Sequence, residues 1–161
     1  MYDLVIRNGV LVDPALGRSE KRDLAIQAGR IVAVASEIAP DAAWDSLDAS
    51  GKLVTPGLID IHVHGAKTHD TGTRRQDDIL RIAEIHGQHG TGAIVPTVYP
   101  GPVETMRENM AAIRGAMASQ SSGAAILGVH LEGPFLNAAY AGALDKKHCQ
   151  DPSPKTLKSL I

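Results

Sequence analysis

From Pro56-Gly57 onward the sequence alternates between short apolar runs and longer stretches whose apolar residues recur at helical spacing. The apolar runs predict three β-strands, at residues 58–64, 93–98 and 124–132. The other stretches predict helices at residues 77–89, 103–117 and 155–161. Strands that alternate with helices form parallel pairs joined by right-handed crossovers. We therefore expect an α/β fold with a parallel sheet in this part of the chain.

Residues 1–55 have a different pattern, in which short apolar pieces are separated by turn residues. Asn8-Gly9 and Ala28-Gly29 each interrupt an apolar run, and a dipeptide of this kind is a strong signal for a two-residue hairpin turn. The pattern predicts two β-hairpins, with a further short strand at Leu53-Val54. We expect these strands to form a small sheet ahead of the α/β part.

The predicted parallel sheet is too small to be complete. Three open parallel strands leave unpaired edges, and the last helical pattern reaches Ile161 without a C-terminal signal. We therefore expect the chain to be the front part of a longer protein.

Charge and composition exclude several functions. Sixteen Lys and Arg residues against 18 Asp and Glu residues give a net charge of −2, which provides no basic surface for nucleic acid or anionic lipid. No apolar run is long enough to cross a bilayer, and the N-terminus has no signal-peptide pattern. A single cysteine, Cys149, cannot form a disulfide framework. We expect a cytoplasmic protein that binds neither nucleic acid nor membrane.

His62 and His64 are separated by one residue on the first parallel strand. Side chains at this spacing leave the same face of a strand, so the two imidazoles supply half of a metal site at its C-terminal end. Asp60 shares that face, where it would accept a hydrogen bond from a metal-binding imidazole. The alternatives are a solvated strand end for the histidines and a wet barrel interior for Asp60.

His130 and Glu132 occupy the corresponding end of the third strand, where the sites of parallel α/β proteins form. A carboxylate that meets two histidines completes a ligand set that zinc accepts in catalytic sites, with a position left for water. Gly133-Pro134 turns the chain directly after Glu132 and keeps this carboxylate at the rim. We expect His130 to lie beside the metal, or inside the barrel, without binding it.

The other histidines and the cysteine carry weaker signals. His69 and Asp70 follow the first strand in a loop, where they contact either substrate or solvent. His86 and His89 lie on the first predicted helix, where solvated histidines are common. Cys149 has cationic neighbours but no arrangement for nucleophilic catalysis.

Three motifs, at residues 56–65, 90–97 and 128–137, resemble the amidohydrolase superfamily and, within it, the N-acetylglucosamine-6-phosphate deacetylases. The resemblance implies the N-terminal part of a (β/α)8 TIM-like barrel preceded by a small β-sandwich segment. Residues 1–55 would be the sandwich segment, and residues 56–161 roughly the first three βα units.

The same resemblance implies a site and a reaction. Glu132 would bind a metal ion, and His62 and His64 would bind a second ion in members that use one, with zinc the expected metal. The backbone near Gly142 and Ala143 would touch the substrate, a small-molecule amino sugar phosphate whose acetamide is hydrolysed by metal-activated water. The catalytic Asp and two further His ligands would lie beyond residue 161, so the chain by itself is expected to be inactive. The complete enzyme is expected to be a homo-oligomer.

Two other functions stay open. One is a different amidohydrolase, such as a dihydroorotase-like or aminoacylase-like enzyme, although Gly65 follows His64 where dihydroorotases have a Leu-Arg stretch. The predicted strands also carry no lysine that could be carbamylated, although such a lysine is expected in a dihydroorotase. The other is a non-catalytic module that pairs through its open barrel edge.

Residues 66–70 and Leu144 depart from the deacetylase pattern, and the resemblance implies that these departures affect substrate selection.

Overall fold

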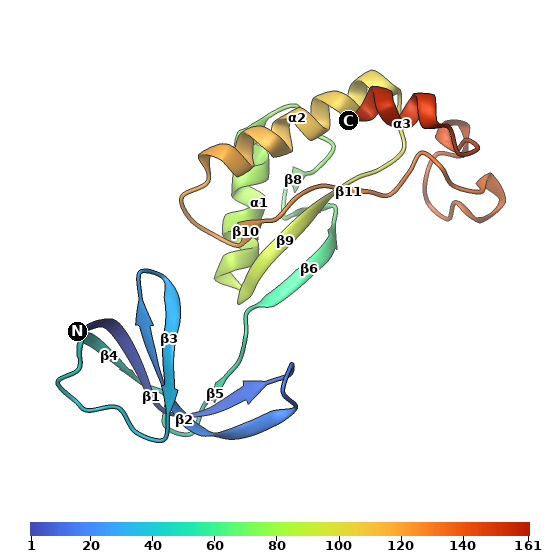
Figure 1. The fold of residues 1–161 in the computed structure, drawn as a ribbon. Coiled ribbons are helices and arrows are strands. Elements are labelled where there is room, and N and C mark those ends of the chain that lie inside the picture. Colours follow the sequence, from blue (N-terminus) through green and yellow to red (C-terminus); the bar gives the residue numbers. More distant parts are fainter. The chain divides into compact units, whose positions relative to one another are not determined.

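The computed structural model describes residues 1–161 and divides the chain into two compact units, Met1–Pro56 and Gly57–Ile161 (Figure 1). No helix in either unit is long and apolar enough to cross a membrane.

The first unit is a single five-stranded sheet in the order β3-β2-β1-β4, with β5 also paired to β1. Its strands are β1 (Tyr2–Asp13), β2 (Arg18–Gln27), β3 (Arg30–Ala35), β4 (Ala43–Asp48) and β5 (Leu53–Val54). The β1–β2 and β2–β3 pairs are antiparallel, whereas β4 and β5 both run parallel to β1. The strand at Leu53–Val54 is confirmed, whereas β4 was not predicted.

The prediction of a hairpin turn at Asn8-Gly9 is wrong. The strand β1 continues through this dipeptide with a register shift between Ile6 and Gly9, and Asn8 adopts a left-handed φ of 63°. A bulge can place such a residue within a strand without reversing the chain. The reversal occurs after Asp13, whose Oδ1 accepts hydrogen bonds from the backbone N–H groups of the next loop. The second predicted hairpin, with its turn at Ala28-Gly29, is confirmed by the antiparallel β2–β3 pair.

Both faces of this sheet are apolar. Val5 and Ala25 are fully buried on one face, where Ile38 packs against them. The residues paired next to them, Ile6 with Leu24 and Leu24 with Val34, lie on the opposite face, because neighbouring positions in a strand alternate. On that face Leu24 is buried, whereas Val34 is 51% exposed. The unit therefore covers one apolar face with its own residues and the other only in part.

The second unit is built on a four-stranded parallel sheet in which β9 is central. On one side β9 (Thr91–Val98) pairs with β6 (Leu58–Val63), and on the other it pairs with β10 (Ala125–Ile126) and then β11 (His130–Leu131). The predicted parallel sheet is confirmed.

The third predicted strand is divided into two pieces, β10 and β11. Ile126 pairs with Ile94, and His130 pairs with Thr97. The third strand therefore advances four residues while β9 advances three, which leaves one extra residue in the third strand. The pairing resumes at β11, so His130 lies directly beside Thr97.

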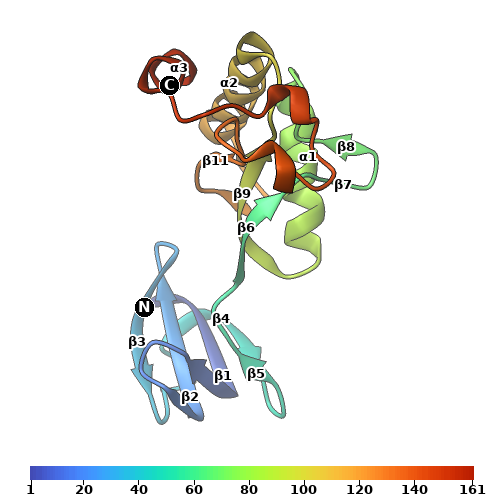
Figure 2. The same cartoon turned by 90° about the vertical axis from the view of Figure 1, so that its right-hand side faces the viewer.

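Three helices and a small hairpin complete this unit. The helices are α1 (Gln76–Gln88), α2 (Val103–Ser119) and α3 (Pro154–Leu160), and all three were predicted with small shifts at their ends. Figure 2 shows α1 and α2 beside the β6–β9 sheet, and Ile79, Ile82, Ile94 and Ile113 from these elements form a fully buried core. The other elements are a hairpin of β7 (Gly65–Ala66) and β8 (His69–Asp70), and two 3₁₀ turns, η1 (Ala138–Tyr140) and η2 (Lys146–His148).

Candidate metal centre

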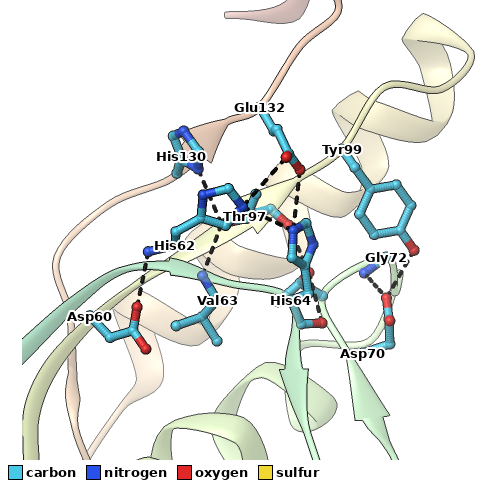
Figure 3. A network of polar contacts seen from close by, with 11 residues as sticks. Asp60, His62, Val63, His64, Asp70, Gly72, Thr97, Tyr99, His130 and Glu132 are labelled. Atoms are coloured by element: carbon cyan, nitrogen blue, oxygen red, sulfur yellow. Dashed lines mark hydrogen bonds and ion pairs between the residues drawn. The ribbon is translucent and has the colours of Figure 1, made fainter. Parts of the chain in front are cut away.

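His62, His64 and Glu132 converge at the C-terminal edge of the parallel sheet (Figure 3). His62 lies on β6, and His64 directly follows this strand. Glu132 directly follows β11, and its backbone N–H continues the pairing by donating to the carbonyl of Val98 at 3.0 Å. The pleat of β6 and the parallel pairing of β9 with β11 thus bring together three side chains that are 70 residues apart at most.

The three side chains meet at short distances. The Nε2 atoms of His62 and His64 are 3.0 Å apart. The carboxylate of Glu132 lies between them, with Oε1 3.5 Å from Nε2 of His62 and Oε2 3.2 Å from Nε2 of His64. The sequence predicted these residues as one group, and the structure brings them together.

These separations fit the binding of a divalent cation. Ligand atoms about 2.0–2.1 Å from a tetrahedral zinc ion lie about 3.3 Å from one another, close to the separations seen here. Oε2 of Glu132 is buried and has no hydrogen-bond partner, although Nε2 of His64 is nearby. A buried carboxylate oxygen without a partner is unfavourable, and a cation held by the same three residues would remove this cost.

Two fully buried threonines hold the backbone on which the histidines are mounted. Oγ1 of Thr97 accepts a hydrogen bond from the N–H of Val63 at 3.0 Å, between the two histidines. The N–H of Thr71 donates to the carbonyl of His64 at 2.9 Å, and its hydroxyl donates to the carbonyl of Thr97 at 2.7 Å. Neither threonine is recognisable from the sequence, because Thr97 in an apolar strand resembles any β-branched core residue and Thr71 lies in a loop after β8.

His130 lies beside the three converging side chains. Its ring centroid is 4.7 Å from that of His62, and its Nδ1 is 3.2 Å from Oγ1 of Thr97. It is not one of the residues whose ligand atoms converge.

Asp60 contacts the backbone of His62. Its Oδ1 accepts a hydrogen bond from the N–H of His62 at 3.1 Å, and no hydrogen bond joins it to an imidazole. Asp60 therefore holds the backbone at the end of β6, and it influences the two imidazoles only through that backbone.

Tyr99, at the end of β9, was not anticipated from the sequence. Its ring centroid is 5.6 Å from that of His64, and its hydroxyl donates to Oδ1 of Asp70 at 3.0 Å. Partial burial, together with the acceptor Asp70, raises the pKa of the Tyr99 phenol. Of the two predicted loop residues, Asp70 is thus linked to His64 through Tyr99, which contacts both.

His69, the other loop residue, binds elsewhere. Its Nδ1 lies 2.9 Å from Oδ1 of Asp78 in the first turn of α1, and the hydroxyl of Thr73 donates to the other oxygen of Asp78 at 2.9 Å. The hydrogen bonds from His69 and then Thr73 lower the pKa of Asp78. His69 therefore anchors the loop to the helix.

Gly142 and Ala143 lie between η1 and η2, and neither forms a hydrogen bond with the converging side chains. The structure does not bring this pair into contact with His62, His64 or Glu132, and their role in substrate binding stays a prediction.

Comparisons with known proteins find similar sequences and structures. The model of the Amidohydrolase family matches residues 53–160. An N-acetylglucosamine-6-phosphate deacetylase from Lysinibacillus sphaericus is 30% identical over 155 residues, covering 96% of this chain and 40% of the relative. A dihydroorotase from Streptococcus pneumoniae is 32% identical over 117 residues, covering 73% of this chain and 27% of the relative.

Among solved structures, an N-acetylglucosamine-6-phosphate deacetylase from Thermotoga maritima superposes with a TM-score of 0.78 at 27% identity. The match covers 96% of this chain and 39% of that protein. The chain thus spans less than half the length of each of these relatives.

Proposed function

The chain belongs to the amidohydrolase family, and from this premise we propose that it is the N-terminal part of a metal-dependent enzyme that hydrolyses amide bonds. The observation that carries the proposal is the convergence of His62, His64 and Glu132 at the C-terminal edge of the parallel sheet. In barrels of this kind, active sites form at that edge.

In this proposal His62, His64 and Glu132 hold one or two divalent ions, with zinc as the expected metal. When bound, such an ion polarises an amide carbonyl and lowers the pKa of water. The chain's own contribution is to hold the ligands in place. Thr97 and Asp60 accept hydrogen bonds from the backbone of β6, and this fixes the direction in which both imidazoles leave the strand.

The proposed reaction is removal of the acetyl group from N-acetylglucosamine 6-phosphate or a related N-acetyl amino sugar phosphate. The deacetylase matches support this substrate class because they extend over nearly the whole chain, whereas the dihydroorotase match covers 73% of it. A dihydroorotase-like activity is the second candidate, favoured by the 32% identity over 117 residues.

We further propose that residues 1–55 form one half of a β-sandwich and that residues 56–161 form the first three βα units of a barrel. The partly uncovered apolar face of the first unit supports the first assignment. The catalytic Asp and the other ligands would come from later strands, with Gly142 and Ala143 near the substrate in the complete, homo-oligomeric enzyme. The 161-residue chain alone would then bind metal without catalysing hydrolysis.

Metal binding by the chain tests the ligand assignment. We expect the wild-type chain to bind zinc in a calorimetric titration, and the Glu132→Gln variant to lose this binding because it lacks the only charged ligand. Glu104→Gln is the matched control, since it removes a carboxylate that is 72% exposed on α2. Equal zinc binding by the wild type and Glu132→Gln would refute the assignment. A wild-type chain that binds no zinc would favour the non-catalytic module.

Activity of the complete protein tests the substrate class. We expect acetate release from N-acetylglucosamine 6-phosphate and no hydrolysis of dihydroorotate. The reverse result would identify the dihydroorotase-like alternative. A zinc-loaded protein that releases no acetate from any N-acetyl sugar phosphate would contradict the deacetylase assignment.

A further inference from the structure

We infer that Thr97 fixes His130 in the tautomer that carries its proton on Nε2. His130 then offers an N–H donor beside His62, His64 and Glu132 and is not a fourth metal ligand. The acceptor would be an oxygen atom of the substrate, and this last part rests on the proposed function. One buried hydroxyl, that of Thr97, determines this tautomer through its hydrogen bonds.

The hydroxyl of Thr97 is completely shielded from solvent, so its bonding must be satisfied within the protein. A threonine hydroxyl has one proton to donate and two lone pairs that accept. One lone pair is used by the N–H of Val63, because a backbone nitrogen can only donate. The proton of the hydroxyl still needs an acceptor.

Nδ1 of His130 is the one acceptor within hydrogen-bond distance of this hydroxyl, at 3.2 Å. The two residues face each other because the pairing of β11 with β9 sets His130 opposite Thr97. If Thr97 donates its proton, Nδ1 is unprotonated, and the proton of the neutral imidazole lies on Nε2.

The opposite tautomer is unfavourable for a specific reason. With a proton on Nδ1, His130 would donate to Thr97, which would then accept two hydrogen bonds and have no partner for its own proton. Leaving a buried donor unsatisfied costs the full desolvation of that group.

The position of His130 gives this tautomer a consequence for the site. The ring packs against His62, and its Nε2 lies on the side of the ring away from Thr97, where no protein group bonds to it (Figure 3). A metal ion needs the lone pair of a neutral imidazole nitrogen. Nε2 of His130 carries a proton instead, so it suits a substrate oxygen next to the ligands.

Nitrogen NMR of histidine-labelled protein measures the tautomer directly. The spectra are recorded on the metal-free chain well above the ordinary histidine pKa of about 6.5, so that the ring is neutral. In the wild type we expect Nδ1 of His130 to resonate as an unprotonated nitrogen and Nε2 as a protonated one. A wild-type spectrum with the proton on Nδ1 would overturn the inference.

Variants of the two buried threonines separate this role from general packing. Thr97→Val removes the hydroxyl at nearly constant shape and should shift His130 toward a mixture of tautomers, whereas Thr97→Ser should restore the wild-type signals. Thr71→Val is the matched control, since Thr71 is equally buried but its hydroxyl bonds to backbone carbonyls and not to His130. Wild-type tautomer signals in a folded Thr97→Val variant would contradict the role of Thr97. If Thr97→Val does not fold, the wild-type and Thr97→Ser spectra decide.

Zinc addition distinguishes the ligands from the donor. We expect zinc to change the Nε2 signals of His62 and His64 while His130 keeps its proton on Nε2. Loss of that proton would show that His130 binds the metal and would overturn the inference. Absence of zinc binding would contradict the proposed function alone, because the tautomer of His130 is established without metal.

In the complete protein, His130→Gln retains a side-chain N–H donor and His130→Leu does not. We expect kcat/KM for His130→Leu to fall about tenfold or more below that of His130→Gln, as for the loss of one hydrogen bond, with equal zinc content. Equal kcat/KM values in the two variants would refute a donor role toward substrate.

Discussion

Asp78 connects the loop after β8 to the first turn of α1. It accepts hydrogen bonds from His69 and Thr73, which lower its pKa below the ordinary aspartate value. A carboxyl whose pKa is depressed on folding stabilises the folded state above its unfolded pKa, and this contribution is lost as the pH falls through the folded pKa. The anchor should therefore work at neutral pH and fail in acid.

We expect Asp78→Asn to unfold at a lower temperature than the wild type at pH about 7, with the difference shrinking below pH about 4, where the wild-type carboxyl becomes protonated. Thermal unfolding followed by circular dichroism across this range measures the effect. Asp77→Asn is the control, because Asp77 is exposed on the same turn of α1 and its side chain forms no hydrogen bond. Parallel pH profiles for the wild type and Asp78→Asn would count against the anchor.

The residues of the cluster are predictable from the sequence to different degrees. His62, His64 and Glu132 can be proposed as one group from the sequence, because their spacing places all three side chains at the C-terminal ends of predicted strands. Thr97 and Tyr99 cannot be recognised in this way, because their roles depend on contacts with residues distant in the sequence, His130 and Asp70. Spacing along each strand predicts the candidate ligands, but the partners that orient them depend on pairing between strands.

At the scale of elements, α1 approaches the segment before β10 unusually closely. A Cβ on Gly87 would lie 2.8 Å from the backbone nitrogen of Ala124, and one on Gly123 would lie 2.7 Å from the carbonyl of Ala83. The N–H of Ala124 donates to that carbonyl at 2.9 Å, so the backbones of the helix and the segment are in direct contact. Glycine at both positions permits this contact.

We expect Gly87→Ala to destabilise the chain although alanine favours helices. The substitution gains about 1 kcal/mol of helix propensity, but overpacking against rigid backbone costs about 1–3 kcal/mol or more. Gly128→Ala, where a Cβ would meet no atom within 4 Å, should change the free energy of unfolding by less than about 0.5 kcal/mol. Urea unfolding measures both, and a more stable Gly87→Ala variant would show that the helix can move away.

The order of the elements is predictable from the sequence, and their irregularities are not. The alternation after Pro56 correctly predicts parallel pairing, because the period of apolar residues changes with the element. The bulge at Asn8 and the division between β10 and β11 escape prediction, since each depends on the register of a neighbouring strand. A hairpin signal such as Asn8-Gly9 also suits a bulge, because both need a left-handed residue.

At the scale of the whole molecule, the first unit exposes an apolar face that a stable protein normally covers. Ile31, Val34 and Leu47 are 61%, 51% and 55% exposed, and Ile31 and Val34 border an apolar pocket with Ile6 and Leu24. Exposed apolar patches of this kind promote association. We therefore expect a substitution on this face to change the association of the isolated chain but the stability of the complete protein.

We expect the 161-residue chain to self-associate as its concentration rises, and Val34→Thr to weaken this association about fivefold, for the loss of about 1 kcal/mol of apolar burial. Val32→Thr is the matched control, because Val32 has a similar exposure of 50% but does not line the pocket. Sedimentation velocity at several concentrations measures the association. In the complete protein a second sheet would cover this face, so Val34→Thr should lower the unfolding temperature there instead of changing association. A wild-type chain that stays monomeric at all concentrations would show that the open face does not drive association.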